Sequence, residues 1–147
     1  MKGDMTIVLD KNDYNKFMAI LGSMDKVDQK PAIRRALSDG VQVIIATGKS
    51  NLAQRNKVKT GNLKKSFKKS IQTKKTSAYA GFIRPKGAHA HLVDRGTKKR
   101  YTRSGYYRGS AKGTLFWTDA VQTKGQEAMS KLMDAIYKSL DNITSRR

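Results

Sequence analysis

The uneven distribution of charge is the feature that most constrains how this chain can fold. Residues 49–112 contain nineteen Lys or Arg and one acidic residue, Asp94. Residues 1–48 hold seven basic and six acidic groups, and residues 113–147 hold five and four. Because only 37% of the residues are hydrophobic, we expect one modest core with exposed or partner-dependent loops. The polycationic middle implies an anionic partner, either nucleic acid or an acidic protein surface.

The length and composition predict a single domain over residues 1–147. The chain has no cysteine, which excludes a disulfide framework and a thiolate metal site and fits a reducing cytoplasm. No apolar run approaches the roughly 20 residues of a membrane span. The first residues, MKGDMTIVLD, lack the long apolar stretch of a secretory signal. We therefore expect a soluble, intracellularly made protein that does not contact a membrane.

Apolar periodicity predicts a strand over 5–10 and three helices. The first helix follows Asp10 or Asn12 as N-cap, with apolar residues at Tyr14, Phe17, Met18, Leu21 and Met24. The second follows Asp28, has Pro31 in its first turn and runs to about residue 54, with a stripe of Ile33, Leu37, Val41, Ile44 and Leu52. Gly40 and Gly48 on or near that stripe indicate close helix packing or a bend. The C-terminal helix has a weak point at Gly125 and a stripe of Met129, Leu132, Met133, Ile136, Tyr137 and Leu140.

The basic middle segment predicts a short helix followed by a β-hairpin. Leu63, Phe67 and Ile71 recur every fourth residue, which favours a helix capped near Thr60 or Asn62 with the lysine pairs 64/65 and 68/69 on its other face. Period-two alternation then predicts strands at about 70–75 and 78–84. We expect an α+β fold, with a small antiparallel sheet packed against a long helix and a C-terminal helix.

Residues 97–113 show no periodicity and predict a long, flexible basic loop, or an arm that a partner orders. Tyrosines lie among its cations, a composition that suits phosphate neutralisation and base stacking and equally suits a protein–protein interface. Local chemistry leaves these two alternatives open. The candidate contact residues are Lys64, Lys65, Lys68, Lys69, Arg95, Lys98, Lys99, Arg100, Tyr101, Arg103, Tyr106, Tyr107, Arg108 and Lys112.

Catalytic signals are weak. His89 and His91, at i and i+2 of a possible strand, have only Asp94 nearby as a further metal ligand. The basic middle lacks the clustered carboxylates of a metal-dependent nuclease, and the chain has no phosphate-binding or nucleophile motif. We expect no enzymatic activity, no cofactor and no bound metal, and keep a nuclease centred on the histidines as a distant alternative.

Three motifs and a hairpin follow one another in a characteristic order. The first motif, T-G-x-L-x-x-S, is matched by Thr60, Gly61, Leu63 and Ser66, and the hairpin follows it. The second, A-h-h-h-[ED]-x-G-T, is matched by Ala90, Leu92, Val93, Asp94, Gly96 and Thr97, and an aromatic entry into the last helix by Phe116, Trp117 and Ala120. This order resembles the tail-completion, or head–tail joining, neck proteins of tailed bacteriophages. The chain departs from the family pattern in its extra N-terminal strand and helix, its high charge and the missing proline before the aromatic entry.

The resemblance implies a virion structural protein that joins the connector of the DNA-filled head to the tail. It implies a core over 31–140 with an N-terminal extension over 1–30, and a homo-oligomeric ring between connector or stopper proteins and tail-terminator proteins. Contact with packaged double-stranded DNA is a further expectation. Such a protein is located in the neck of the virion after assembly in the host bacterial cytoplasm. The alternative is a small basic DNA- or RNA-binding protein that uses residues 57–112.

Overall fold

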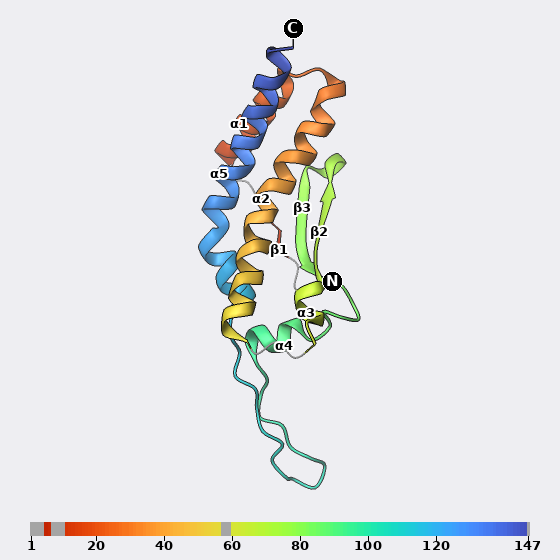
Figure 1. The fold of residues 1–147 in the computed structure, drawn as a ribbon, viewed down its shortest axis with the longest axis vertical. Coiled ribbons are helices and arrows are strands. Elements are labelled where there is room, and N and C mark those ends of the chain that lie inside the picture. The colour runs from red at the N-terminus through yellow and green to blue at the C-terminus, as the bar shows by residue number, and fades with distance from the viewer. Residues whose placement is uncertain (1–4, 7–10, 57–59, 147) are drawn as a thin grey trace.

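The computed structural model describes residues 5–6, 11–56 and 60–146, which form the predicted α+β fold (Figure 1). The strands are β1 (Met5–Thr6), β2 (Phe67–Gln72) and β3 (Ser77–Phe82), with a short 3₁₀ turn η1 (Thr73–Lys75) between the last two. The helices are α1 (Lys11–Gly22), α2 (Lys26–Arg55), α3 (Asn62–Lys65), α4 (Ala90–Arg95) and α5 (Phe116–Thr144).

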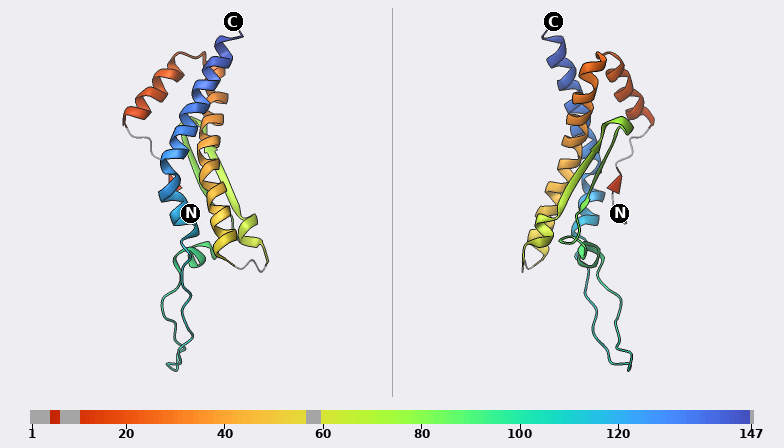
Figure 2. Two further views of the ribbon diagram at one scale, coloured as in Figure 1. Left: turned by 60° about the vertical axis from the view of Figure 1, so that its left-hand side comes forward. Right: turned by 90° about the vertical axis from the view of Figure 1, so that its right-hand side faces the viewer.

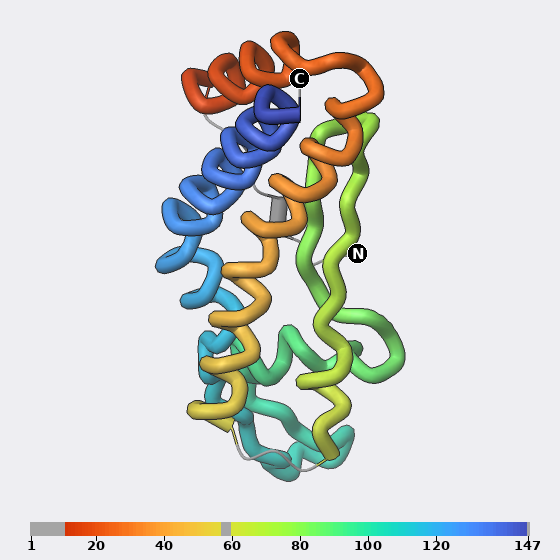
Figure 3. Tube along the Cα trace, turned by 45° about the horizontal axis from the view of Figure 1, so that its top comes forward, coloured from red at the N-terminus to blue at the C-terminus, as the bar shows by residue number. Residues whose placement is uncertain are grey.

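Helix α2 lies at the centre of the molecule. Helix α5 runs antiparallel along one side of it, and the β2–β3 hairpin lies along the other (Figures 1 and 3). Large apolar side chains of α2 such as Leu37, Val41 and Ile44 are buried in this arrangement. The predicted packing of a small sheet against a long helix and a C-terminal helix is confirmed.

Small residues set the spacing between the two long helices. A Cβ atom on Gly40 would lie 2.9 Å from the carbonyl oxygen of Ala128, and one on Gly48 would lie 2.8 Å from the Trp117 ring. Both glycines of α2 therefore mark close helix packing, one of the two roles that the sequence suggested for them. Facing residues of α5 that are fully or almost fully buried include Ala128, Ala135 and Ser139.

The three-stranded sheet is antiparallel, with strand order β1-β3-β2. In the hairpin Phe67 pairs with Phe82 and Gln72 pairs with Ser77, so the turn spans 73–76. Phe67 and Ile71 are partly buried against the core. Between them on the same face lies Lys69, whose ammonium donates to Ser38 Oγ at 2.8 Å and Gln42 Oε1 at 3.2 Å on α2.

This placement of Lys69 corrects the prediction of a helix reaching residue 71. Helix α3 ends at Lys65, and Phe67 and Ile71 belong to β2. Both strands of the hairpin therefore start earlier than predicted, at Phe67 and Ser77. A spacing of four fits one face of a strand as well as one face of a helix. A lysine between Phe67 and Ile71 is compatible with this face of the strand, because its side chain stays exposed while its ammonium reaches polar partners on α2.

The N-terminal part joins the same core. Phe17 of α1 is fully buried and Leu21 nearly so, and α1 lies beside the C-terminal half of α5 (Figure 2). The predicted first helix is confirmed, whereas the second begins at Lys26 rather than after Asp28, which places Pro31 beyond its first turn. Of the strand predicted over 5–10, Met5–Thr6 forms β1 and the rest lies outside the described residues.

Two matched glycine substitutions test the close helix packing. We expect Gly40→Ala to destabilise the fold by about 1–2 kcal/mol, because overpacking against a backbone carbonyl outweighs the roughly 1 kcal/mol gained in helix propensity. Gly125→Ala in α5, where a Cβ meets nothing within 4 Å, should stabilise by up to about 1 kcal/mol. Urea unfolding of both variants measures the difference. Equal stabilisation by the two would show that the α2–α5 contact is looser than described.

Candidate functional site: a basic arm and its clasp

Residues 97–112, here called the arm, extend beyond the helix pair and the sheet (Figures 1 and 2). The arm is a two-stranded ribbon rather than an unpaired loop. Its root is paired by the amide of Thr97, which donates to the Ala111 carbonyl at 2.8 Å. Further out, the amide of Arg108 donates to the Arg100 carbonyl at 2.7 Å. Antiparallel backbone pairing therefore continues well beyond the root.

The tip of the arm is held by its own polar groups. The amide of Tyr106 donates to Thr102 Oγ1 at 2.9 Å, and Gly105 has a positive φ of 85° that suits a tight turn. Tyr101 and Tyr107 face each other across the ribbon with ring centroids 5.5 Å apart. The Tyr106 side chain remains 76% exposed at the end of the arm.

The predicted cations of the arm are brought together on this projection. None of them forms an ion pair within the part of the chain that the structure describes, where the ion pairs are Arg55–Asp119 and Lys124–Glu127. All are exposed, and they come from both strands and the tip: Arg95 at the root, Lys98, Lys99, Arg100, Arg103, Arg108 and Lys112. The arm is thus a concentration of positive charge without an internal counter-charge.

The four lysines of the preceding segment differ in whether they have partners within the fold. Lys64 and Lys65 are exposed on α3, which lies with α4 at the end of the body from which the arm projects (Figure 1). Lys68 is exposed on the outer face of β2. Lys69 is also exposed, but its ammonium donates to Ser38 and Gln42 of α2, so this predicted contact residue already has partners within the fold.

The two strands of the arm meet the body at a tight crossing. A Cβ atom on Gly96 would lie 2.4 Å from the Ala111 carbonyl oxygen, and one on Gly113 would lie 2.5 Å from the Asp94 carbonyl oxygen. Gly96 also has a positive φ of 82°. Thr97 Oγ1 accepts a hydrogen bond of 2.8 Å from the Ala111 amide. We call Gly96, Thr97, Ala111, Gly113 and Thr114 the clasp, because they hold the two strands of the arm together at a place where side chains have no room.

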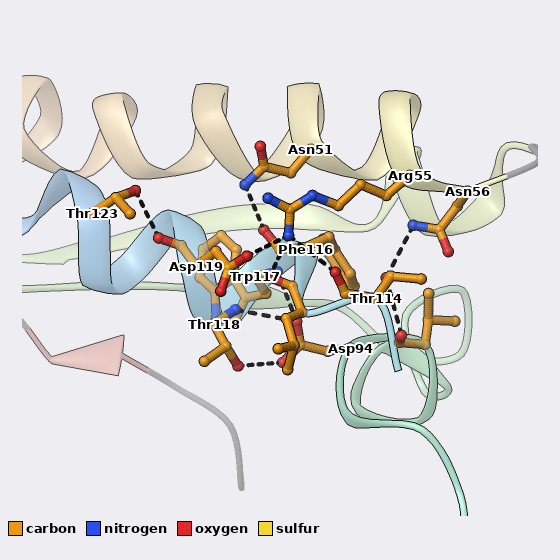
Figure 4. A network of polar contacts seen from close by, with 12 residues as sticks. Asn51, Arg55, Asn56, Asp94, Thr114, Phe116, Trp117, Thr118, Asp119 and Thr123 are labelled. Carbon is orange, nitrogen blue, oxygen red and sulfur yellow. Dashed lines mark hydrogen bonds and ion pairs between the residues drawn. The ribbon is translucent and has the colours of Figure 1, made fainter. Parts of the chain in front are cut away.

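The buried carboxylate of Asp94 joins the clasp to helix α5 (Figure 4). Asp94 is 5% exposed. Its Oδ1 accepts from the amides of Trp117 at 2.7 Å and Thr118 at 3.1 Å, and its Oδ2 accepts from Thr118 Oγ1 at 2.5 Å. These amides lie in the first turn of α5, where they have no partner within the helix and where the helix dipole favours an anion. Asp94 is therefore the N-terminal cap of α5, supplied from 23 residues earlier in the chain.

Asp94 therefore acts on α5 and not on the arm itself. The start of the arm is held by Thr97, through its side-chain and backbone bonds to Ala111. Backbone bonds reinforce the connection, since the Leu115 amide donates to the Asp94 carbonyl at 2.8 Å. The second motif and the aromatic entry are thus one structural unit.

The C-terminal end of α2 binds the same junction. Asn51 Nδ2 donates to the Phe116 carbonyl at 3.0 Å, and Arg55 Nη1 donates to the Thr114 carbonyl at 3.0 Å and pairs with Asp119. Asn56 Nδ2 donates to Thr114 Oγ1 at 3.2 Å (Figure 4). These two residues of α2 and the adjacent Asn56 were not predicted from the sequence, because polar residues at a helix end carry no signal of a partner about 60 residues away.

The first motif closes the neighbouring corner of the fold. Gly61 has a positive φ of 70° at the start of α3, and Leu63 is buried. Ser66 is fully buried, and its hydroxyl donates to the Leu63 carbonyl at 2.7 Å. Gly87 passes so close that a Cβ would lie 2.7 Å from Ser66 Oγ.

Four aromatic rings connect this corner to the start of α5. The Phe67 and Phe82 centroids lie 4.7 Å apart across the hairpin, and those of Phe82 and Trp117 lie 5.2 Å apart. Phe116 completes the cluster at 5.8 Å from Phe82. Buried residues of all three motifs, Leu63, Ala90, Phe116 and Trp117, belong to the same hydrophobic core.

The histidines do not form the predicted pair on a strand. His89 precedes α4 and His91 lies within it, both exposed, and residues two apart on a helix point in different directions. Across the described ranges, no three His, Asp or Glu side chains are grouped so that they could hold a metal ion. Among the helices described, none combines the length and apolar character needed to cross a bilayer.

Comparisons with protein-family models, with curated proteins and with solved structures found no match to this chain. The function of the arm and its clasp must therefore be inferred from their own chemistry. That chemistry is the presentation of unpaired positive charge on a projection whose root is fixed to the core.

Replacing Asp94 tests the cap. We expect Asp94→Ala to lower the free energy of unfolding by roughly 2–4 kcal/mol, because the cap is lost and two buried amides lose their acceptor. Asp94→Asn keeps an acceptor oxygen and should cost about 1 kcal/mol. Asp134→Ala, at an exposed position of α5, is the matched control and should change stability by less than about 0.5 kcal/mol. Denaturant unfolding that ranked Asp94→Ala with this control would contradict the capping role.

Proposed function

We propose that the chain is a structural protein of the neck of a tailed bacteriophage, joining the head connector to the tail as one subunit of a ring. The proposal rests on the order of the three motifs and the hairpin in the sequence. No enzymatic step, cofactor or metal is part of it. The virion neck is its proposed location, after assembly in the host cytoplasm.

The observation that best supports this proposal is the coupling of the motifs through Asp94. The A-h-h-h-[ED]-x-G-T segment and the aromatic entry occur in a fixed order in the resemblance, separated by a variable loop. In this chain the Asp94 carboxylate bonds directly to the first turn of α5, so that the variable loop is clamped at its root. A carboxylate at that motif position suits the cap whatever the loop contains, because both of its oxygens accept hydrogen bonds from the first turn of the helix. The motif is thus explained as scaffold, which is what an assembly protein requires.

In a ring, identical subunits pack head to tail, and such contacts close when the rotation per subunit permits. The arm would be the assembly element of each subunit. We propose that the turn at its tip, around Arg103 and Ser104, is mobile in the free protein and becomes ordered on an anionic partner. Coupled ordering of this turn would occur only when that partner is present, which suits a fixed sequence of assembly.

The second candidate is a DNA- or RNA-binding protein outside the virion, which the unpaired cations of the arm favour. Both functions require the arm cations, so DNA binding in solution cannot distinguish them. They differ in whether the protein is a component of particles. The test of the proposed function is therefore made on particles.

Quantitative mass spectrometry of density-purified virions of the encoding phage, scaled to the major capsid protein, tests the neck assignment. We expect a small fixed number of copies per virion, as a ring requires, and none in heads that lack tails. A protein absent from virions and sedimenting with nucleic acid in the lysate would overturn the neck assignment in favour of the second candidate.

Charge reversal provides a functional test in the same system. Lys98→Glu, Lys99→Glu and Arg100→Glu together should block particle completion, leaving separate heads and tails. The matched control reverses Lys26, Lys30 and Arg34, exposed residues of α2 with the same composition, and should leave the titre within about tenfold of wild type. Normal completion with the reversed arm would contradict its role in assembly.

A further inference from the structure

An anionic partner would neutralise the positive charge of the arm, and the structure of the arm favours one kind of anion. We propose that the arm binds double-stranded DNA, entering the major groove as a two-stranded ribbon with its cations on the phosphates of both groove walls. The major groove is about 12 Å wide and admits such a ribbon. Only the place of this contact, packaged DNA within the neck channel, rests on the proposed function.

The cations are distributed over both strands of the arm. Lys98, Lys99 and Arg100 lie on the outgoing strand and Arg108 and Lys112 on the returning strand, and all five are exposed. A flat acidic protein surface would contact one side of the ribbon and leave the cations elsewhere on it without counter-charge. A groove with phosphates on both walls can neutralise the cations of both strands at once.

Charge is the dominant property of the arm. Tyr101, Tyr106 and Tyr107 are each more than half exposed, and the rings of Tyr101 and Tyr107 face each other at 5.5 Å. These rings lie among six Lys or Arg and no acidic residue between residues 97 and 112. Attraction between charges can therefore supply most of the binding, as it does in sequence-independent DNA binding.

A second copy of this chain does not supply the main counter-charge of the arm. Each copy carries a net charge of +20, so two copies repel each other. The exposed acids of the described surface lie mainly along α2 and α5, and in the groove between these helices they are balanced by lysines: Asp39, Glu127 and Asp134 against Lys124, Lys131 and Lys138. A neutral groove cannot compensate an arm with no acid of its own.

The root of the arm is fixed to the body before any partner binds. The Asp94 cap and the close approach of Gly96 to Ala111 hold the two strands together where they leave the body. The root therefore loses little conformational freedom on binding, and preorganisation of this kind reduces the entropic cost of association. Lys64 and Lys65 on α3 lie at the same end of the molecule (Figure 1) and extend the positive surface around the root.

Salt-dependent binding of the full-length protein to a blunt DNA duplex of about 20 base pairs and mixed sequence tests the inference. Fluorescence anisotropy should give a line of log affinity against log salt with a slope steeper than about −4, at roughly 0.9 per phosphate neutralised. The variant with Lys98→Gln, Lys99→Gln and Arg100→Gln should bind more weakly and reduce that slope by two to three. The control with Lys26→Gln, Lys30→Gln and Arg34→Gln loses the same charge from α2 and should retain the wild-type slope within about one. Equal losses in the two variants would overturn the inference, because binding would then follow net charge rather than the arm.

Two competitors test the kind of anion. Poly-glutamate at the same concentration of negative charge should displace the DNA at least tenfold less effectively, since it has no groove with two charged walls. An A-form RNA duplex of equal length, whose major groove is deep and narrow, should also compete less well. Competition by either at parity with DNA would overturn the groove-binding mode. Because this assay uses the free protein, its failure leaves the particle analysis untouched, and absence from particles leaves the DNA contact untouched.

Discussion

The hydrogen bonds of the Asp94 carboxylate are the interaction on which the rest of this structure depends. A buried carboxylate is costly unless it is well hydrogen-bonded, and Asp94 receives two amides and a hydroxyl at the start of a 29-residue helix. The same contact determines where α5 begins, where Trp117 enters the core and where the arm leaves it. Loss of the cap would therefore affect the core and the arm together.

The packing around this contact follows from small residues and from one unusual lysine. Gly48 gives the Trp117 ring its place against α2, and Gly40 lets α5 approach at Ala128. On the opposite side of α2, Lys69 spans the inner face of the sheet and reaches Ser38 and Gln42. These contacts join two helices and a hairpin so that the charged arm stands apart from the core.

Large apolar residues at regular spacing made α1, α2, α5 and the hairpin predictable from the sequence, and the fold class with them. The start of β2 was not predictable in this way, because the spacing of Phe67 and Ile71 fits one face of a helix as well as one face of a strand. The basic arm was located as a charged stretch, but its pairing was not, since Thr97 and Ala111 lie in no periodic pattern. The cap by Asp94 and the bonds of Arg55 join residues 23 to 64 apart, and nothing local in the sequence indicates such partners.

The clasp and the Asp94 cap imply that the root of the arm is locked before any partner is bound, whereas the turn at its tip is free to move. Amide hydrogen exchange of the free protein tests this difference. We expect the amides of Thr97, Ala111, Leu115 and Trp117 to exchange nearly as slowly as the core of α2, while Arg103 and Ser104 at the tip exchange rapidly. Exchange of the root amides as fast as those of the tip would contradict this expectation, because the clasp would then form only on the partner.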